Sequence, residues 1–292
     1  MAALHQMLEA AVTTERLERA GVARGVLERA LTPLDLRTVQ VSKGRATGET
    51  GQSSFLLAYA MSFILYLALL LYGVQVMSSV VEEKNSRVIE VLVSSVSPIE
   101  LLLGKVLGVG AVGLTQLYIW AGTAMALTTF RVPIARLFGM HASSVARLPI
   151  PTVSPELLIV FLVFFVLGFF LYAAAYAAVG AMCNSMNEAQ QANIPVTMCI
   201  AGGLLCMFAL LSQPSGPLAK TLSVIPFVAP FVVPVRYSFS AITTGEIVVS
   251  GLSTFFGVVV LTWIAARIYR VGILSYGKRA SVKEVWRWVR VG

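Results

Sequence analysis

Five long, charge-free runs of apolar residues constrain the fold of this chain more than any other feature of its sequence. A helix of about 20 apolar residues crosses the roughly 30 Å hydrocarbon core of a bilayer. Each run is long enough for one crossing, so together they predict an all-α integral membrane protein with a five-span helical bundle. The runs are Phe55–Val81, Val106–Phe130, Leu157–Cys183, Ile194–Ser212 and Ile247–Ala266.

A sixth apolar stretch, Thr221–Val235, is too short for a span and contains three prolines. Pro226, Pro230 and Pro234 follow one another at intervals of four residues, and each removes a backbone donor and disturbs the preceding helical turn. Irregular backbone at membrane depth is tolerated where protein shelters it. We therefore expect a broken external helix pair here rather than a sixth span.

The orientation of the spans follows from basic residues, which collect on the cytoplasmic side of membrane proteins. We expect a cytoplasmic tail and, with five spans, an external N-terminal segment. The chain then divides into a residual external segment and linker at 1–54, a transmembrane domain at 55–270 and a cytoplasmic amphipathic tail at 271–292. The basic residues that decide this are Arg267, Arg270, Lys278, Arg279, Lys283, Arg287 and Arg290.

The two ends of the chain carry local patterns of their own. Thr38–Ser42 alternates apolar and polar residues, which predicts a strand. Gly44–Ser54 is rich in Gly, Ser and Thr, which is typical of a linker. Near the other end, Ser281 and Glu284 form a capping box that would begin a helix.

The net charge of +8 fits a membrane surface better than a nucleic acid. Only 12% of the residues are charged, against about 25% in an average soluble domain. No soluble domain offers a continuous basic face for a phosphate backbone, whereas anionic lipid headgroups attract basic segments beside a span. We therefore expect the lipid bilayer, and no nucleic acid, as a partner.

The segment between the first two runs has two faces. Polar residues recur at helical spacing on one face, and apolar residues fill the other. This pattern predicts an amphipathic helix on the cytoplasmic surface, which either rests on lipid headgroups or docks onto a partner. The polar face holds Glu83, Arg87, Glu90 and Ser94, and the apolar face holds Val88, Val91, Leu92 and Val96.

Short blocks distributed over Phe55–Gly292 resemble the type 2 ABC exporter permeases and, within them, the NatB-like sodium-export permeases. The first blocks are Glu82-Glu83-Lys84, Arg87-Val88-Ile89-Glu90-Val91-Leu92, Ser95-Val96-Ser97-Pro98 and Leu101-Leu102-Leu103-Gly104-Lys105. The later blocks are Ala174-Ala175-Tyr176-Ala177-Ala178-Val179-Gly180, Glu188-Ala189-Gln190-Gln191, Ile225-Pro226-Phe227, Pro234-Val235-Arg236 and Arg267-Ile268-Tyr269-Arg270. The resemblance implies the permease subunit of an ATP-driven exporter, with sodium as its substrate.

The resemblance also implies how such a permease is driven. The segment Glu82–Glu100 would be a cytoplasmic coupling helix that receives force from an ABC ATPase subunit, which alone binds ATP and Mg²⁺. A second permease subunit would complete a homo- or heterodimer. Permeases of this kind usually have six spans, so we expect this chain to lack the first. The candidate coupling residues are Glu82, Glu83, Arg87, Glu90, Pro98 and Glu100.

The sequence offers no residues for hydrolysing ATP. A Gly-x-x-x-x-Gly-Lys-Ser/Thr loop is absent, because Val106 follows Lys105 and Arg279 follows Lys278. The two histidines, His5 and His141, are far apart in sequence and form no zinc-binding helix motif. We therefore expect a transport subunit with no catalytic residue, no metal site and no cofactor of its own.

Polar residues are few within the apolar runs. Burying an amide in lipid is costly, so we expect Gln75 and Gln116 to face other helices or a substrate pathway, with Thr115 and Asn193 as further candidates. Hydrogen bonding between helices explains these residues equally well. Because no Asp or Glu lies in the middle of any run, export of a lipid, drug or peptide is the alternative to sodium. A noncatalytic, truncated membrane protein without transport is the third interpretation.

Overall fold

The computed structural model of the protein describes residues 39–42, 45–86, 96–137, 139, 154–210, 213–272 and 284. The chain divides into two units, residues 1–39 and residues 40–292. Almost all described elements belong to the second unit. The helix predicted to begin at Ser281 lies outside the described residues apart from Glu284.

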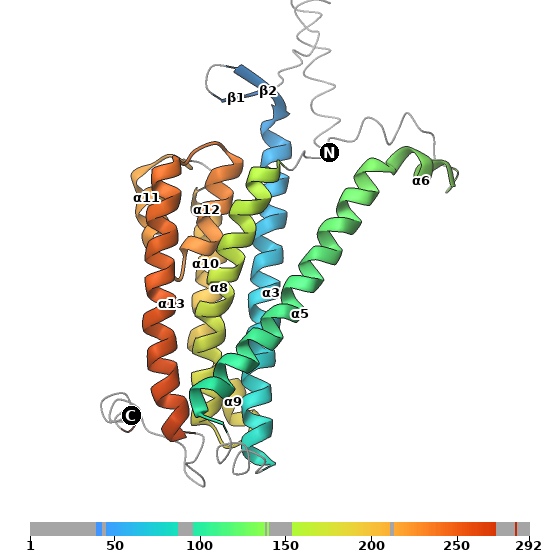
Figure 1. The fold of residues 1–292 in the computed structure, drawn as a ribbon. Helices are drawn as coiled ribbons and strands as arrows, with labels where there is room; N and C mark the ends of the chain where they lie inside the picture. The colour runs from blue at the N-terminus through green and yellow to red at the C-terminus, as the bar shows by residue number, and fades with distance from the viewer. Residues whose placement is uncertain are drawn as a thin grey trace, which may run out of the picture. The chain divides into compact units, whose positions relative to one another are not determined.

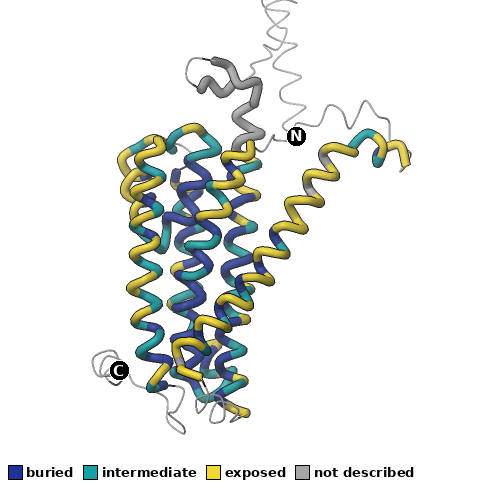
Figure 2. The backbone as a smooth tube through the Cα atoms, viewed as in Figure 1, coloured by how far each residue is buried: buried dark blue, intermediate teal, exposed yellow. Residues whose placement is uncertain are grey.

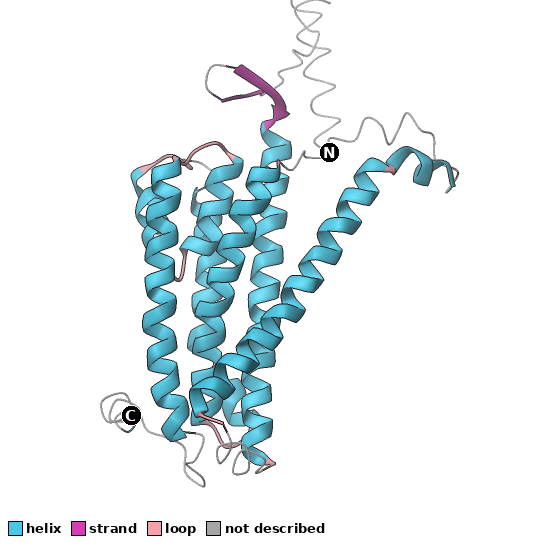
Figure 3. Cartoon of the chain, in the orientation of Figure 1, coloured by secondary structure: helices cyan, strands magenta, loops and turns pink. Residues whose placement is uncertain are grey.

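Four helices are long and apolar enough to cross a membrane: α3 (Gly51–Asn85), α5 (Pro98–Thr129), α8 (Pro155–Met182) and α13 (Thr244–Gly272). The short α9 (Met186–Ala192) and the longer α10 (Ile194–Leu210) meet at an angle of 43° and make a fifth crossing if they count as one bent span. Helices form nearly all of the described chain (Figure 3). The predicted all-α membrane fold is therefore confirmed, and each predicted run matches one of these helices.

The shorter elements are β1 (Val39–Ser42), β2 (Arg45–Thr50), α6 (Arg131–Leu137), α11 (Pro217–Val224) and α12 (Ala229–Ser238). β1 confirms the strand expected at Thr38–Ser42. The segment expected to be a linker instead contains β2 and the first turn of α3. Pairing with β1 gives the backbone of β2 hydrogen-bond partners, and composition alone does not reveal such pairing.

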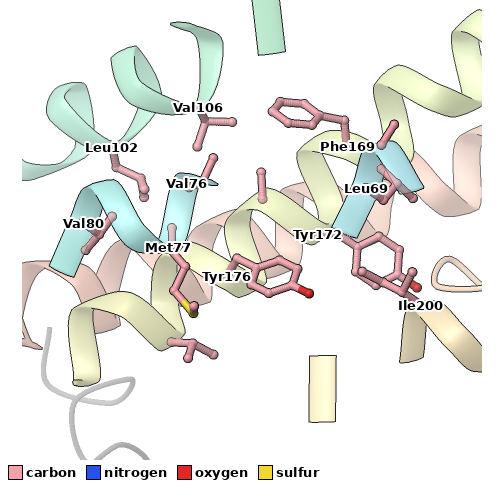
Figure 4. Close-up of a cluster of buried hydrophobic side chains, with 14 of the residues drawn as sticks. Leu69, Val76, Met77, Val80, Leu102, Val106, Phe169, Tyr172, Tyr176 and Ile200 are labelled. Carbon is pink, nitrogen blue, oxygen red and sulfur yellow. The ribbon is translucent and has the colours of Figure 1, made fainter. Parts of the chain in front are cut away.

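Helix α8 lies between α3 and α13 and packs along both (Figure 1). Its second half is almost entirely buried, as the dark tube in Figure 2 shows. Lipid tails are as apolar as leucine, so close packing rather than exclusion of water holds membrane helices together. The small residues Ala173, Ala177 and Ala181 permit this close packing. Figure 4 shows the resulting core, in which Leu69, Val76 and Met77 of α3 meet Phe169, Tyr172 and Tyr176 of α8.

Helix α5 packs on the bundle only along its first half. Gly110 lies against the ring of Phe169, and Gly113 lies against the ring of Tyr72. Leu117 is the last buried residue of α5, and every later residue of the helix whose exposure is described is exposed. Figure 1 shows α5 leaning away from the other helices beyond this point. The second half of α5 therefore presents its side chains to lipid or to another chain.

Helices α11 and α12 form a hairpin that enters the bundle and returns to the same end (Figure 1). At its turn, Pro226 fits against Gly257 of α13, where a Cβ atom would lie 2.6 Å from the Cβ of the proline. Pro230 fits in the same way against Gly168 of α8, at 3.0 Å. Both glycines lie near the middle of their helices, so the hairpin reaches about half the depth of the bundle. The prediction of a broken, sheltered element is confirmed, with the break between Val224 and Ala229 beside Pro226 and Pro230, whereas Pro234 lies inside α12.

Side chains of α8 and α13 satisfy carbonyl groups that the break in the hairpin releases. The hydroxyl of Ser253 donates to the carbonyl oxygen of Val224 at 2.6 Å. The hydroxyl of Tyr172 donates to the carbonyl oxygen of Phe227 at 2.7 Å. An unbonded backbone group in hydrocarbon costs several kcal/mol, so these two bonds are what make the turn tolerable at this depth.

Arg236, in the last turns of α12, is fully buried and holds the open end of the hairpin together. Its guanidinium donates to the carbonyl oxygens of Pro214 and Ala241, each at 2.9 Å, and to the hydroxyl of Ser223 at 2.8 Å. It also pairs with the carboxylate of Glu246 at 2.7 Å. Burying a cation is costly unless it is paired and hydrogen-bonded, and here all three guanidinium nitrogens have partners.

The first prediction concerns this buried arginine. Arg236→Met should lower the unfolding temperature by several degrees, because it leaves the groups bonded by Arg236 without their donor, at about 1–3 kcal/mol for each buried one. The measurement is thermal unfolding of the purified chain in detergent. Lys220→Met is the matched control, because Lys220 is 59% exposed and lies 3.5 Å from the same Glu246. An exposed pair of this kind contributes about 0–1 kcal/mol, and equal losses in the two variants would contradict the role of Arg236.

The second prediction concerns sidedness. At one end of the bundle α3, α8 and α13 end and α5 begins, beside α9; we call this the α9 end (Figure 1). The hairpin opens at the opposite end. The basic residues after α13 predict that the α9 end is cytoplasmic. In a background with Cys183, Cys199 and Cys206 replaced by alanine, Ser215→Cys near the hairpin should react with an impermeant thiol reagent added to intact cells.

The matched position is Ser86, which is exposed at the α9 end. Ser86→Cys should react only after the cells are permeabilised. The reverse pattern of labelling would invert the orientation, and labelling of both in intact cells would contradict a five-span bundle.

Candidate functional site

The candidate coupling residues that the structure describes lie in two different membrane helices. Glu82 and Glu83 belong to the last turn of α3, and Pro98 and Glu100 belong to the first turn of α5. Arg87 and Glu90 lie outside the described residues. The segment Glu82–Glu100 is therefore not one continuous helix, because Ser97 has extended backbone angles, with φ −68° and ψ 146°.

A capping box explains why α5 begins at Pro98 rather than at the predicted Val106. The hydroxyl of Ser97 accepts from the backbone N–H of Glu100 at 3.3 Å, and the Glu100 carboxylate accepts from the backbone N–H of Ser97 at 3.0 Å. Each group satisfies a donor that the helix start would leave free. Hydropathy counts only apolar residues, so it places the start of this helix two turns too late. Glu100 is exposed and available to a partner.

An ion pair joins the end of α3 to α5. Glu83 accepts a close hydrogen bond from the ammonium of Lys105. The Lys105 side chain is 7% exposed and the Glu83 side chain 28% exposed, so the cation is the more deeply buried partner. Glu83 thus bonds within the protein, whereas its neighbour Glu82 is exposed.

Lys84 joins the end of α3 to two further helices. It is 2% exposed, and its ammonium donates to the carbonyl oxygen of Ala181 at 3.0 Å and to that of Gly272 at 2.8 Å. These carbonyls belong to the last turns of α8 and α13, where the final four carbonyls of a helix have no partner within it. The negative end of each helix dipole also favours a cation there. One buried lysine therefore caps two helices.

Helix α9 begins beside these helix ends with a cap of its own. The Ser185 hydroxyl accepts from the backbone N–H of Glu188 at 3.3 Å, and the Glu188 carboxylate accepts from the backbone N–H of Asn184 at 3.0 Å. Glu188 is also close enough to Lys84 to interact with its charge. The α9 end is thus a layer of charged residues that join α3, α5, α8 and α13.

The four candidate pathway residues lie in different elements: Gln75 in α3, Thr115 and Gln116 in α5, and Asn193 at the end of α9. Gln75 is exposed and Gln116 is half-buried, and within the described chain no hydrogen bond joins any two of the four. The Thr115 hydroxyl donates to the carbonyl oxygen of Ala111 in its own helix at 2.8 Å. Asn193 lies at the bend between α9 and α10, where its backbone N–H donates to the Ala189 carbonyl oxygen at 2.9 Å. The Thr115 side chain is thus bonded within its own helix, and the bond of Asn193 is made by its backbone; their place in a substrate pathway stays a prediction.

Sequence reasoning missed Lys84, Lys105 and Arg236 as organising residues. Each lies in a block that carries the family resemblance. Such a block shows which residues recur in the family, but it does not show what each of them contacts. A lysine in the last turn of a span is a usable signal, because lysine near a helix C-terminus commonly bonds terminal carbonyls. The sequence does not say which helices supply those carbonyls, since Ala181 and Gly272 are remote from Lys84 along the chain.

Known proteins match this chain along nearly its whole length. The family model of the ABC-2 family transporter proteins matches residues 2–267. The chain belongs to the ABC-2 transporter family. With its several apolar helices long enough to cross a bilayer, this ABC-2 permease is a multi-pass protein of the plasma membrane.

Two curated relatives extend the match. The uncharacterized protein YhaP of Bacillus subtilis is 30% identical over 289 residues, which cover 99% of this chain and 68% of the relative. The uncharacterized protein MJ1024 of Methanocaldococcus jannaschii is 28% identical over 271 residues, which cover 93% of this chain and 62% of the relative. The permease thus spans about two thirds of the length of each. No solved structure matches it.

The third prediction tests the ion pair between α3 and α5. Glu83→Gln should destabilise this permease more than Lys105→Met, because it leaves the more deeply buried charge without its partner, whereas an unpaired Glu83 reaches water. The double variant Glu83→Gln/Lys105→Met should be more stable than Glu83→Gln alone, since it removes the buried charge. Thermal unfolding in detergent gives the order. Glu82→Gln is the matched control and should change little; an opposite order of the two single variants would contradict the pairing.

Proposed function

We propose that this ABC-2 permease is the membrane-spanning subunit of an ATP-driven exporter, with ATP and Mg²⁺ bound and hydrolysed by a separate ABC ATPase subunit. The observation that supports this is the layer of charged residues at the α9 end. The connection from α3 to α5 leaves the bundle there, and Glu83 and Lys84 tie its start to α5, α8 and α13. Force applied to this connection therefore reaches four membrane helices.

The candidate coupling residues divide into two groups under this proposal. Glu82 and Glu100 are exposed, so we assign them to contact with the ATPase, together with Arg87, Glu90 and Pro98 from the sequence pattern. Glu83 is bonded to Lys105, so its role is to connect α3 with α5. The coupling segment therefore both meets the partner and is anchored in the membrane helices.

A second permease subunit, identical or different, completes the proposed transporter. The first half of α5 supports this, because Gly104 and Gly108 have nothing within 4 Å of the position that a Cβ atom would take. Small residues one turn apart let two membrane helices approach closely. This glycine pair is thus free to pack on another subunit. That a first span is missing from this chain stays a prediction.

Sodium is the first substrate to test, because it follows from the family resemblance. The structure gives a specific reason to test an amphiphile beside it. Carbonyl groups at the hairpin turn would be natural cation ligands at membrane depth, but those of Val224 and Phe227 already accept bonds from Ser253 and Tyr172. The exposed second half of α5 is apolar, with Tyr118, Ile119, Trp120, Met125 and Leu127 on its surface, and it suits a lipid, drug or hydrophobic peptide.

The fourth prediction tests the proposed function. The tagged permease, purified in mild detergent from its own cells, should bring down an ATPase subunit, and the pair in inside-out vesicles should move substrate inward when ATP is added. Radioactive sodium and a fluorescent lipid are the two probes. Accumulation of either identifies the substrate class. ATPase recovery without movement of either would exclude sodium and lipid, and failure to recover an ATPase would contradict the proposed function.

Arg87→Glu shows whether the coupling segment recruits the ATPase. The change places a like charge close in sequence to Glu83 and Glu90. Even a lost i, i+4 pair would cost only about 0.2–0.5 kcal/mol, too little to unfold the permease. We expect normal insertion and loss of the ATPase from the purified complex. Arg136→Glu, an exposed arginine of α6, is the matched control and should retain the ATPase. Retention of the ATPase by Arg87→Glu would exclude this segment as the docking site.

A further inference from the structure

We propose that Lys84 is the positioning residue that transmits movement of the coupling segment, through α8 and α13, to the α11–α12 hairpin. The proposal rests on the proposed function. It names the residue through which force from the ATPase would reach the other side of the membrane. Lys84 lies at the end of α3, α8 and α13 both contact the hairpin, and α5 is attached to α3 by a different residue.

Lys84 lies at the point where α3 gives way to the coupling segment. Its helix ends one residue later, at Asn85, so any rotation or pull on the segment acts first on this turn. The ammonium bonds two carbonyls that come from helices remote in the sequence, at 3.0 Å and 2.8 Å. The group is buried, so neither water nor a lipid headgroup competes for these bonds. A displacement of the end of α3 therefore displaces the ends of α8 and α13 with it.

Helices α8 and α13 carry such a displacement to the hairpin. α8 holds the hairpin turn through the bond from Tyr172 to Phe227 and the contact of Gly168 with Pro230. α13 holds the same turn through the bond from Ser253 to Val224 and the contact of Gly257 with Pro226. The two helices also pack on each other along their length. The same pair of helices is thus capped by Lys84 at one end and bonded to the hairpin at mid-depth.

Helix α5 is attached to α3 by a different residue. Glu83, next to Lys84, pairs with Lys105 of α5, while the Lys84 ammonium bonds only α8 and α13 among the described helices. Successive residues of a helix point about 100° apart, which is how neighbours reach different helices. The end of α3 is therefore a branch point, at which Glu83 leads to α5 and Lys84 leads to the hairpin.

The test measures the thiol reactivity of the hairpin turn while the ATPase acts on the coupling segment. In the background without native cysteines, Ile225→Cys places a thiol at the hairpin turn, where Ile225 is 41% exposed. Trapping the co-purified ATPase with ATP and vanadate should change the rate at which this thiol reacts severalfold. Lys84→Met should abolish that change while ATPase binding and ATP hydrolysis continue. Lys84→Arg, which keeps a cation with several donors, should restore at least part of the change.

Arg270→Met is the matched control, because Arg270 is an exposed cation in the last turn of α13. It should keep the response of the hairpin. A full response in Lys84→Met, or an equal loss in Arg270→Met, would overturn the proposal. If Lys84→Met fails to insert, Lys84→Gln takes its place, since its shorter neutral side chain does not span both carbonyls.

A second measurement on the permease alone separates this proposal from the proposed function. Spin labels at Ser86 and Asn187, both exposed at the α9 end, report the separation of α3 from α9, which follows α8. The distribution of distances should be narrow in the parent protein and in Lys84→Arg, and broad in Lys84→Met. An unchanged distribution of distances in Lys84→Met would contradict the proposal that Lys84 holds the ends of these helices together, even where an ATPase binds. Broadening in Lys84→Met, combined with no ATPase recovered in the purification described above, would show that Lys84 holds these helix ends and that the proposed function has failed.

Discussion

Every backbone amide and carbonyl inside the hydrocarbon must find a partner within the protein, and the structure of this permease depends on that constraint. Four helices satisfy it by their own ladders of hydrogen bonds. The α11–α12 hairpin cannot, because its helices stop at Val224 and resume at Ala229. Ser253 and Tyr172 bond carbonyls in this interval. The hairpin thus exists only because α8 and α13 stand beside it with the right donors.

The same constraint explains the two fully buried cations of the described residues, Lys84 and Arg236. Helix ends inside a protein leave carbonyls without partners, and a side chain with several donors satisfies more than one of them. Lys84 does so where α8 and α13 end, and Arg236 bonds carbonyls of the segments that flank the hairpin. Each cation joins segments that are remote in sequence. The two ends of the bundle are therefore held by charge, and the apolar packing around α8 holds the region between them.

This arrangement gives a physical meaning to the division between α5 and the rest of the bundle. α3, α8 and α13 are joined by packing and by Lys84, whereas α5 is packed only along its first half and joined through Glu83 and Lys105. A transporter needs parts that move relative to one another. The weakly attached α5 and the tightly joined remainder are the natural candidates, with the coupling segment between them.

The sequence by itself determined the spans, because a charge-free run of apolar residues has few alternatives to crossing a bilayer. It also determined that the helix breaks in the proline-containing stretch, because proline removes a backbone donor, but not that the break lies beside Pro226 and Pro230 while Pro234 lies inside α12. It did not place the start of α5 at Pro98, since the capping box at Ser97 and Glu100 adds polar residues to an apolar helix. It marked Gln75 and Gln116 as polar residues within spans, but their exposure depends on how the helices pack, and only the structure shows that Gln75 is exposed and Gln116 half-buried. Only the tertiary structure decided what Lys84 and Arg236 bond, because their partners are backbone carbonyls, which every residue carries and no sequence pattern marks.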